Sequence, residues 1–111
     1  MLKGRRILIA VSGGIAAYKT PFVIRELIKR GAEVRVVMTE NAQRFVTPQT
    51  LSVLSRNRVY SEMFCEDPEF TVLHVELAEW AECVAIVPAT ANVIAKAAHG
   101  LADDLLSTLL L

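Results

Sequence analysis

A short apolar run that ends in two glycines and leads into a helical pattern is the feature that most constrains this chain. The run is Ile7–Val11, and Ser12-Gly13-Gly14-Ile15 follows it directly. Such a run is typical of a buried parallel strand. Glycines let the backbone approach a ligand closely, and the first N–H groups of a helix attract negative charge. These residues therefore predict an α/β protein with a phosphate-binding loop, without identifying the ligand.

The rest of the chain alternates strand and helix patterns. We predict further strands over 33–38 and 84–87, a helix over 15–30 that ends at Gly31, and short helices within 39–45 and over 48–54. Pro21 either kinks the first helix or lies in the first turn of a helix that restarts with Thr20 as its cap. The inner face of this helix is predicted to be Val23, Ile24, Leu27 and Ile28.

The second half of the chain is harder to interpret. Residues 59–72 look irregular, and 74–82 fit either a helix or an edge strand. Helical spacing returns from residue 92, is interrupted at Gly100, and allows another helix over 103–111. The alternation as a whole predicts a doubly wound parallel sheet with helices on both faces. Ligands of such sheets bind beyond the carboxyl ends of the strands, where the segments 12–15, 39–45 and 88–92 are expected.

Composition restricts the class of protein. The chain has 111 residues, 53% of them hydrophobic, and a formal net charge of zero, which fits one globular domain. Eleven of the twelve Lys and Arg residues lie in 1–58, and nine of the twelve acids lie in 59–111. This split indicates differently charged solvated faces, contacts between unlike ends of subunits, or a preference for an anionic ligand. Nucleic acid is disfavoured because no basic run is interleaved with aromatic residues.

The cysteines and the lengths of the apolar runs exclude several further classes of protein. Cys65 and Cys83 make no disulfide framework, and no Cys/His spacing resembles a zinc site. Cys83 begins an apolar run and is predicted to be a small core residue, whereas Cys65 lies in a polar stretch typical of a surface loop. The apolar run at 7–11 is too short for a signal peptide, and no stretch is long enough to span a membrane. We expect a cytoplasmic protein.

The glycine pattern argues against two common nucleotide sites. A dinucleotide fingerprint needs G-x-G-x-x-G, and the chain has only Gly13-Gly14 followed by Ile15-Ala16-Ala17. Glu40 follows the second predicted strand where an acid could bind a ribose, but the missing glycines make NAD a poor fit. No Gly-Lys-Ser/Thr follows the loop, so a Walker motif is absent. What remains is a mononucleotide phosphate bound by backbone N–H groups and by hydroxyls such as those of Ser12 and Thr39.

Several ordered motifs together resemble a known family. They are Ser12-Gly13-Gly14-Ile15-Ala16-Ala17-Tyr18-Lys19, Val37-Met38-Thr39, His74-Val75-Glu76-Leu77, Pro88-Ala89-Thr90-Ala91-Asn92-Val93 and Gly100-Leu101-Ala102-Asp103-Asp104. This set resembles the homo-oligomeric flavin-containing cysteine decarboxylases, and within them the phosphopantothenoylcysteine decarboxylases of coenzyme A biosynthesis. The resemblance covers the whole chain. It implies a Rossmann-like flavoprotein with a flavodoxin-like three-layer sandwich, here a single FMN-binding domain over 1–111.

The resemblance also implies roles for individual residues. Gly13, Gly14 and Ile15 would line the flavin site with Ser12 beside them, Thr39 would help to bind the phosphate, and Phe45 would lie near the cofactor. Thr90, Ala91, Asn92 and Val93 would contact the flavin, although 88–93 alone could be an ordinary strand-to-helix turn capped by Thr90 or Asn92. His74 matches the essential histidine of the family, where it would handle a proton or bind a carboxylate. Without that context, His74 would be interpreted as a packing residue. His99 has no such context and is interpreted as a surface or helix-end residue.

The implied reaction is the FMN-dependent decarboxylation of 4′-phosphopantothenoylcysteine to 4′-phosphopantetheine through a thioaldehyde, in a homotrimer or a dodecamer of trimers. Family members carry a Pro-x-Met-Asn-x-x-Met-Trp motif and a later cysteine, and this sequence has neither. We therefore expect the domain to be C-terminally truncated and unable to complete the reaction alone. A peptidyl-cysteine decarboxylase, a flavin prenyltransferase and a non-catalytic flavin-binding subunit are the alternative functions.

Overall fold

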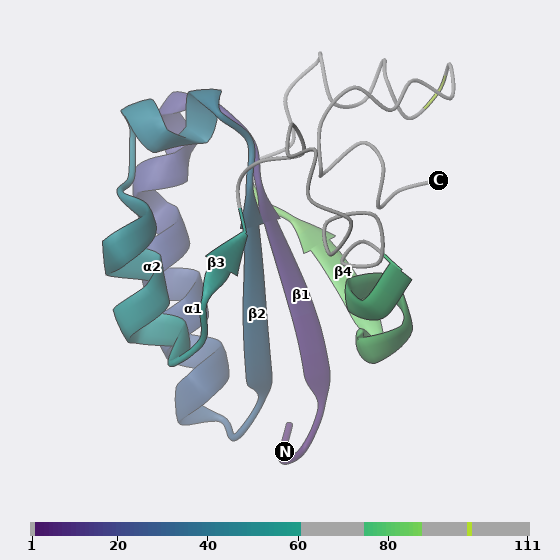
Figure 1. Ribbon diagram of the computed structural model, residues 1–111. Coiled ribbons are helices and arrows are strands. Elements are labelled where there is room, and N and C mark those ends of the chain that lie inside the picture. The colour runs from purple at the N-terminus through teal and green to yellow at the C-terminus, as the bar shows by residue number, and fades with distance from the viewer. Residues whose placement is uncertain (1, 61–74, 88–97, 99–111) are drawn as a thin grey trace.

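A four-stranded parallel sheet forms the centre of the molecule (Figure 1). The computed structural model describes residues 2–60, 75–87 and 98. The strands are β1 (Arg6–Val11), β2 (Glu33–Met38), β3 (Val59–Tyr60) and β4 (Cys83–Ile86), in the spatial order β3-β2-β1-β4. Successive strands move outward from β1 to β3 on one side, whereas β4 pairs with the other side of β1. The strand order therefore reverses beside β1, which is where doubly wound sheets bind ligands.

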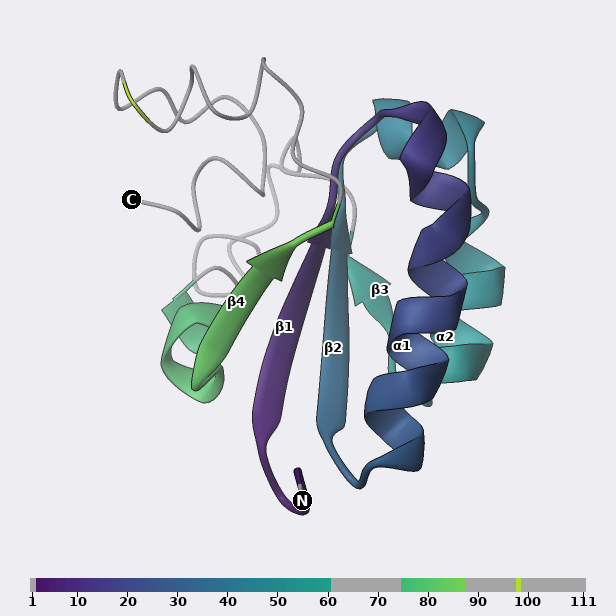
Figure 2. The ribbon, with the colours of Figure 1, turned by 180° about the vertical axis from the view of Figure 1, so that it is seen from behind.

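Helices cover both faces of this sheet (Figures 1 and 2). One face carries the 3₁₀ turn η1 (Ile15–Lys19), the helix α1 (Thr20–Lys29) and the helix α2 (Pro48–Ser55). The other face carries the helix at residues 75–80. The predicted doubly wound architecture is confirmed in this part of the chain.

Alternating strand residues supply two separate cores. Ile9, Val36 and Met38 are fully buried on the face that packs against Ile24 of α1 and Leu51 of α2. The residues between them point to the opposite face, where Leu8, Ala10 and Val37 pack around Leu77. Because side chains alternate across a strand, one apolar run can fill both cores.

The first helix begins and ends at the signals in its sequence. It restarts at Thr20 with Pro21 in its first turn, so the restart interpretation is correct and the kink is wrong, although Thr20 is the first helical residue and not the cap. Of the predicted inner face, Ile24 is fully buried and the other three residues are half-buried. Gly31 follows the helix with a φ of 91°, a left-handed conformation that glycine adopts without a steric penalty.

The second helix is capped at both ends by local geometry. Thr47 is its N-cap, and the Thr47 hydroxyl oxygen accepts a hydrogen bond of 3.2 Å from the Thr50 N–H. The helix ends at Arg56, whose φ of 62° is unusual for a residue other than glycine. The Asn57 amide next donates to the Val34 carbonyl oxygen at 2.8 Å, which directs the chain into β3 beside β2.

The structure tests three predictions for the second half of the chain. The segment from residue 59 was expected to be irregular, but Val59–Tyr60 pairs with Val36–Val37 as β3. The ambiguous segment 74–82 is helical at 75–80. The prediction that Cys83 is a core residue is wrong, because β4 is one of the two edge strands of the described sheet and Cys83 is exposed there. Cys65 and the helices expected after residue 92 lie outside the described residues.

Candidate functional site

Two of the three predicted ligand segments lie together at the carboxyl end of the sheet. Ser12 follows β1 and is fully buried, and Thr39 follows β2 and is 8% exposed. The Thr39 N–H donates to the Val11 carbonyl oxygen at 2.9 Å, so the pairing of the two strands continues into these segments. The third segment, with Thr90, Ala91, Asn92 and Val93, and the candidate catalytic His74 lie outside the described residues.

Gly13 and Asn41 are in direct contact, which fixes the distance between the two segments. A Cβ added at Gly13 would lie 2.5 Å from the Asn41 Cβ and 3.0 Å from the Asn41 carbonyl carbon. Any side chain at position 13 would therefore push the segments apart. The glycine predicted for ligand approach is also required by the packing between two loops.

The β1–η1 turn closes through backbone hydrogen bonds. The Gly14 N–H donates to the Ser12 carbonyl oxygen at 3.1 Å, and the Ala17 N–H donates to the Gly14 carbonyl oxygen at 2.8 Å. Gly14 is the N-cap of the following turn and, because it has no side chain, makes no side-chain capping hydrogen bond. These bonds stabilise one conformation of the turn, and that conformation positions Ser12 and Gly13.

Thr39 begins the second turn and keeps one hydrogen-bonding function available. Its hydroxyl oxygen accepts a hydrogen bond of 3.2 Å from the Ala42 N–H at the start of η2 (Asn41–Arg44). A threonine hydroxyl has one donor hydrogen as well as its acceptor lone pairs. Thr39 can therefore donate to an anionic oxygen while it stabilises its own turn.

Two large apolar side chains next to these turns are exposed. Ile15, the first residue of η1, is 77% exposed, and Phe45, which follows η2, is 44% exposed. A planar aromatic ligand with a phosphate could bury such side chains while its phosphate contacts the turns. The two segments therefore offer polar and apolar contacts at one end of the sheet.

Thr20, which the sequence suggested only as a helix cap, makes a long-range contact in this region. It is fully buried, and its hydroxyl donates to the Val87 carbonyl oxygen at 3.0 Å, across 67 positions of sequence. Val87 follows β4, and its own N–H donates to the Ala10 carbonyl oxygen of β1 at 2.8 Å. Nothing local in the sequence reveals a bond between such distant residues.

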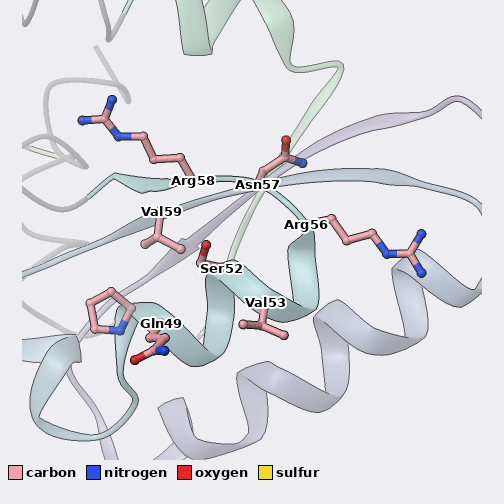
Figure 3. Close-up of a pocket in the computed structure, with 8 residues that line it drawn as sticks. Gln49, Ser52, Val53, Arg56, Asn57, Arg58 and Val59 are labelled. Atoms are coloured by element: carbon pink, nitrogen blue, oxygen red, sulfur yellow. The ribbon is translucent and has the colours of Figure 1, made fainter.

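A cavity elsewhere on the surface is a poorer candidate. It measures about 700 Å³ and lies along α2 and β3 (Figure 3). Its lining residues are Pro48, Gln49, Ser52, Val53, Arg56, Asn57, Arg58 and Val59. The Arg56 and Arg58 side chains extend in opposite directions, so they do not converge on one anion. None of the predicted ligand residues lines this cavity.

The described residues offer no metal site, and a carboxylate with a lowered pKa lies at the other end of the sheet. Within 2–60, 75–87 and 98, no group of three His, Cys, Asp or Glu residues could hold a metal ion. The Arg6 N–H and the Arg5 guanidinium, in this order of effect, lower the pKa of Glu82, which lies at the opposite, amino end of the strands. In the described part of the chain no helix is both long and apolar enough to cross a membrane.

Comparison with known proteins identifies the family. The sequence model of the family described as Flavoprotein matches residues 1–111. The chain belongs to the flavoprotein family. It is 49% identical over 111 residues to the coenzyme A biosynthesis bifunctional protein CoaBC of Bacillus subtilis and 48% identical over 110 residues to CoaBC of Escherichia coli. The match covers 100% and 99% of this chain and 27% of each relative, so the chain spans about a quarter of their length.

Solved structures of this flavoprotein fold agree with the sheet and its helices. The FMN-dependent cysteine decarboxylase SpaF gives a TM-score of 0.86 at 34% identity, covering 99% of this chain and 63% of SpaF. A variant of PPC decarboxylase in complex with pantothenoylaminoethenethiol gives 0.79 at 32% identity, covering 97% of this chain and 60% of that protein. Both matches extend beyond the described residues over nearly the whole sequence.

Proposed function

We propose that this flavoprotein chain is the FMN-binding part of a phosphopantothenoylcysteine decarboxylase, which converts 4′-phosphopantothenoylcysteine to 4′-phosphopantetheine in coenzyme A biosynthesis. The observation that carries the proposal is the 49% identity to CoaBC over the whole chain. The likeness to PPC decarboxylase, solved with a pantothenoyl-containing ligand, supports the same substrate class.

The described residues fit an FMN group. Its phosphate would contact the turn of Ser12, Gly13 and Gly14 and the hydroxyl of Thr39, where backbone N–H groups and a free donor hydrogen meet an anion. Its ring system would cover the exposed side chains of Ile15 and Phe45. The proposed set is completed by Thr90, Ala91, Asn92 and Val93, which follow β4 in the sequence.

The protein residues would orient the substrate and handle charge. When bound, FMN would supply reversible two-electron oxidation of the substrate carbon that carries the thiol. His74 would hold a proton or bind the substrate carboxylate, since an imidazole titrates near neutral pH. It directly precedes the helix at 75–80, which Leu77 attaches to the sheet through Leu8 and Val37.

A second candidate is a peptidyl-cysteine decarboxylase. The likeness to SpaF, an FMN-dependent cysteine decarboxylase with a TM-score of 0.86, favours it over other flavin chemistry. The two candidates share FMN and His74 and differ in the molecule that carries the cysteine. A cytoplasmic location and a homotrimer, or a dodecamer of trimers, also belong to the proposal.

The test uses the complete natural protein that contains these residues. We expect it to purify with flavin absorbance bands and to release carbon dioxide from 4′-phosphopantothenoylcysteine faster than from a peptide with a C-terminal cysteine. His74→Asn should retain FMN and lose decarboxylation, whereas the matched variant His99→Asn should keep both. A faster reaction with the peptide would favour the second candidate, and FMN binding without either reaction would overturn both.

A further inference from the structure

We propose that Thr20 is a positioning residue for the FMN site: its hydroxyl attaches the helix that follows the glycine turn to the end of β4. The inference rests on the proposed function, because it concerns the same cofactor. It assigns a role to a residue that would lie behind the ligand and not against it.

The contact spans the point where the strand order reverses. β1 and β4 are neighbours, and Val87 is held from both sides, since its N–H donates to Ala10 at 2.8 Å and its carbonyl oxygen accepts from Thr20 at 3.0 Å. The end of β4 is thereby attached to β1 through its N–H and to α1 through its carbonyl oxygen.

The same residue is linked through η1 to the first ligand segment, 12–15. Thr20 begins α1 directly after η1, and η1 begins at Ile15 at the end of the glycine turn. One buried hydroxyl therefore connects the helix that follows the glycine turn to the end of β4, across the point where the strand order reverses. A change at Thr20 would alter the position of the glycine turn relative to β4 without removing any atom of that turn.

The chemistry of the contact favours this role over simple packing. Thr20 is fully buried, and its partner is a backbone carbonyl, so loss of the hydroxyl leaves a buried acceptor without this donor. Thr20→Val keeps the shape and removes the donor, whereas Thr20→Ser keeps the donor and removes a methyl group. The two variants separate hydrogen bonding from volume.

The experiment measures FMN dissociation constants and the visible circular dichroism of bound flavin in the complete natural protein. We expect Thr20→Val to weaken FMN binding about three- to tenfold, as loss of one buried hydrogen bond predicts, and to change the flavin spectrum. Thr20→Ser should keep the FMN affinity and the flavin spectrum of the parent. The matched control is Ser55→Ala, because Ser55 is 1% exposed and its hydroxyl also donates to backbone carbonyls, at the far end of α2.

Each outcome has one interpretation. If the parent binds FMN and Thr20→Val binds it with the same affinity and spectrum, the role of Thr20 is wrong and the proposed function stands. If Ser55→Ala weakens FMN binding equally, the effect is general destabilisation and the role of Thr20 is again wrong. A parent that binds no FMN overturns the proposed function itself. Should Thr20→Val fail to fold, Thr20→Cys, which retains only a weak donor, gives the same comparison with Thr20→Ser.

Discussion

Gly13→Ala is the sharpest test of the contact between the two ligand turns. The new Cβ would lie 2.5 Å from the Asn41 Cβ, 3.0 Å from the Asn41 carbonyl carbon and 3.2 Å from the Ala42 nitrogen. Carbon atoms in favourable contact are about 3.5–4.0 Å apart, so the turns must separate by about 1 Å or more. Two of the three atoms belong to the backbone, so no side-chain rotation relieves the contact. Overpacking of this kind costs about 1–3 kcal/mol.

The assay combines denaturant unfolding with FMN titration. We expect the free energy of unfolding to fall by about 1–3 kcal/mol and FMN affinity to fall with it, because both turns belong to the proposed site. Adding Asn41→Gly removes the atom at 2.5 Å and should recover part of the loss, since the two backbone contacts persist.

The control is Gly4, where an added methyl group would strain the backbone but contact no neighbouring atom. Gly4 has a φ of 75° and no atom within 4 Å of an added Cβ, so Gly4→Ala strains the backbone without a clash. It should cost about 1–2 kcal/mol and leave FMN affinity unchanged. Unchanged stability and FMN affinity in Gly13→Ala would refute the close approach of the two turns, and a double variant with no recovery would refute the assignment to Asn41.

Three further predictions concern stability. Leu77→Ala should lower the free energy of unfolding by about 2–5 kcal/mol in denaturant titration, because Leu77 is fully buried against Leu8 and Val37; a loss below 1 kcal/mol would contradict that packing. Arg56→Gly should raise the urea midpoint by an amount equivalent to about 1 kcal/mol, since Arg56 has a φ of 62°; a lower midpoint would contradict this. Glu82 contributes stability above its ordinary pKa of 4.5 and loses it as pH falls through its lower folded pKa. The melting temperature of the parent should therefore exceed that of Glu82→Gln at neutral pH, with a difference that shrinks on acidification below pH 4.5; a constant difference would be inconsistent with this linkage.

The strands and the first two helices were predictable because their signals are local. The run Ile7–Val11 is apolar throughout, as a strand with two covered faces requires, and Gly31 is where the helix needs a left-handed residue. The helix at 75–80 was ambiguous because Val75 and Leu77 alternate as in a strand, whereas Leu77 and Trp80 have helical spacing. β3 was missed because two residues carry no periodicity, and its pairing with β2 depends on the Asn57 contact with Val34.

The site was predictable in outline and not in its internal contacts. The position of the turns follows from strand order, so Ser12–Ile15 and Thr39–Phe45 could be placed at one edge before the structure was known. The Thr20–Val87 bond joins residues 67 positions apart, and the Gly13–Asn41 contact depends on how two turns pack. Cys83 shows the same limit, because an apolar run predicts a strand but not whether that strand is central or outer.

The two ends of the sheet are stabilised by different kinds of contact, and the difference matches the proposed function. At the amino end, Arg5 and Glu82 form an exposed ion pair at 3.0 Å, an interaction that solvent screens and that contributes little. At the carboxyl end, the contact of Gly13 with Asn41 and the hydroxyl bond of Thr20 are both neutral, and Thr20 is fully buried. Neither of these two contacts contains a carboxylate, so neither adds a fixed negative charge where an anionic ligand would bind. Substitutions at the amino end should therefore change stability alone, whereas substitutions at Gly13 or Thr20 should change stability and FMN affinity together.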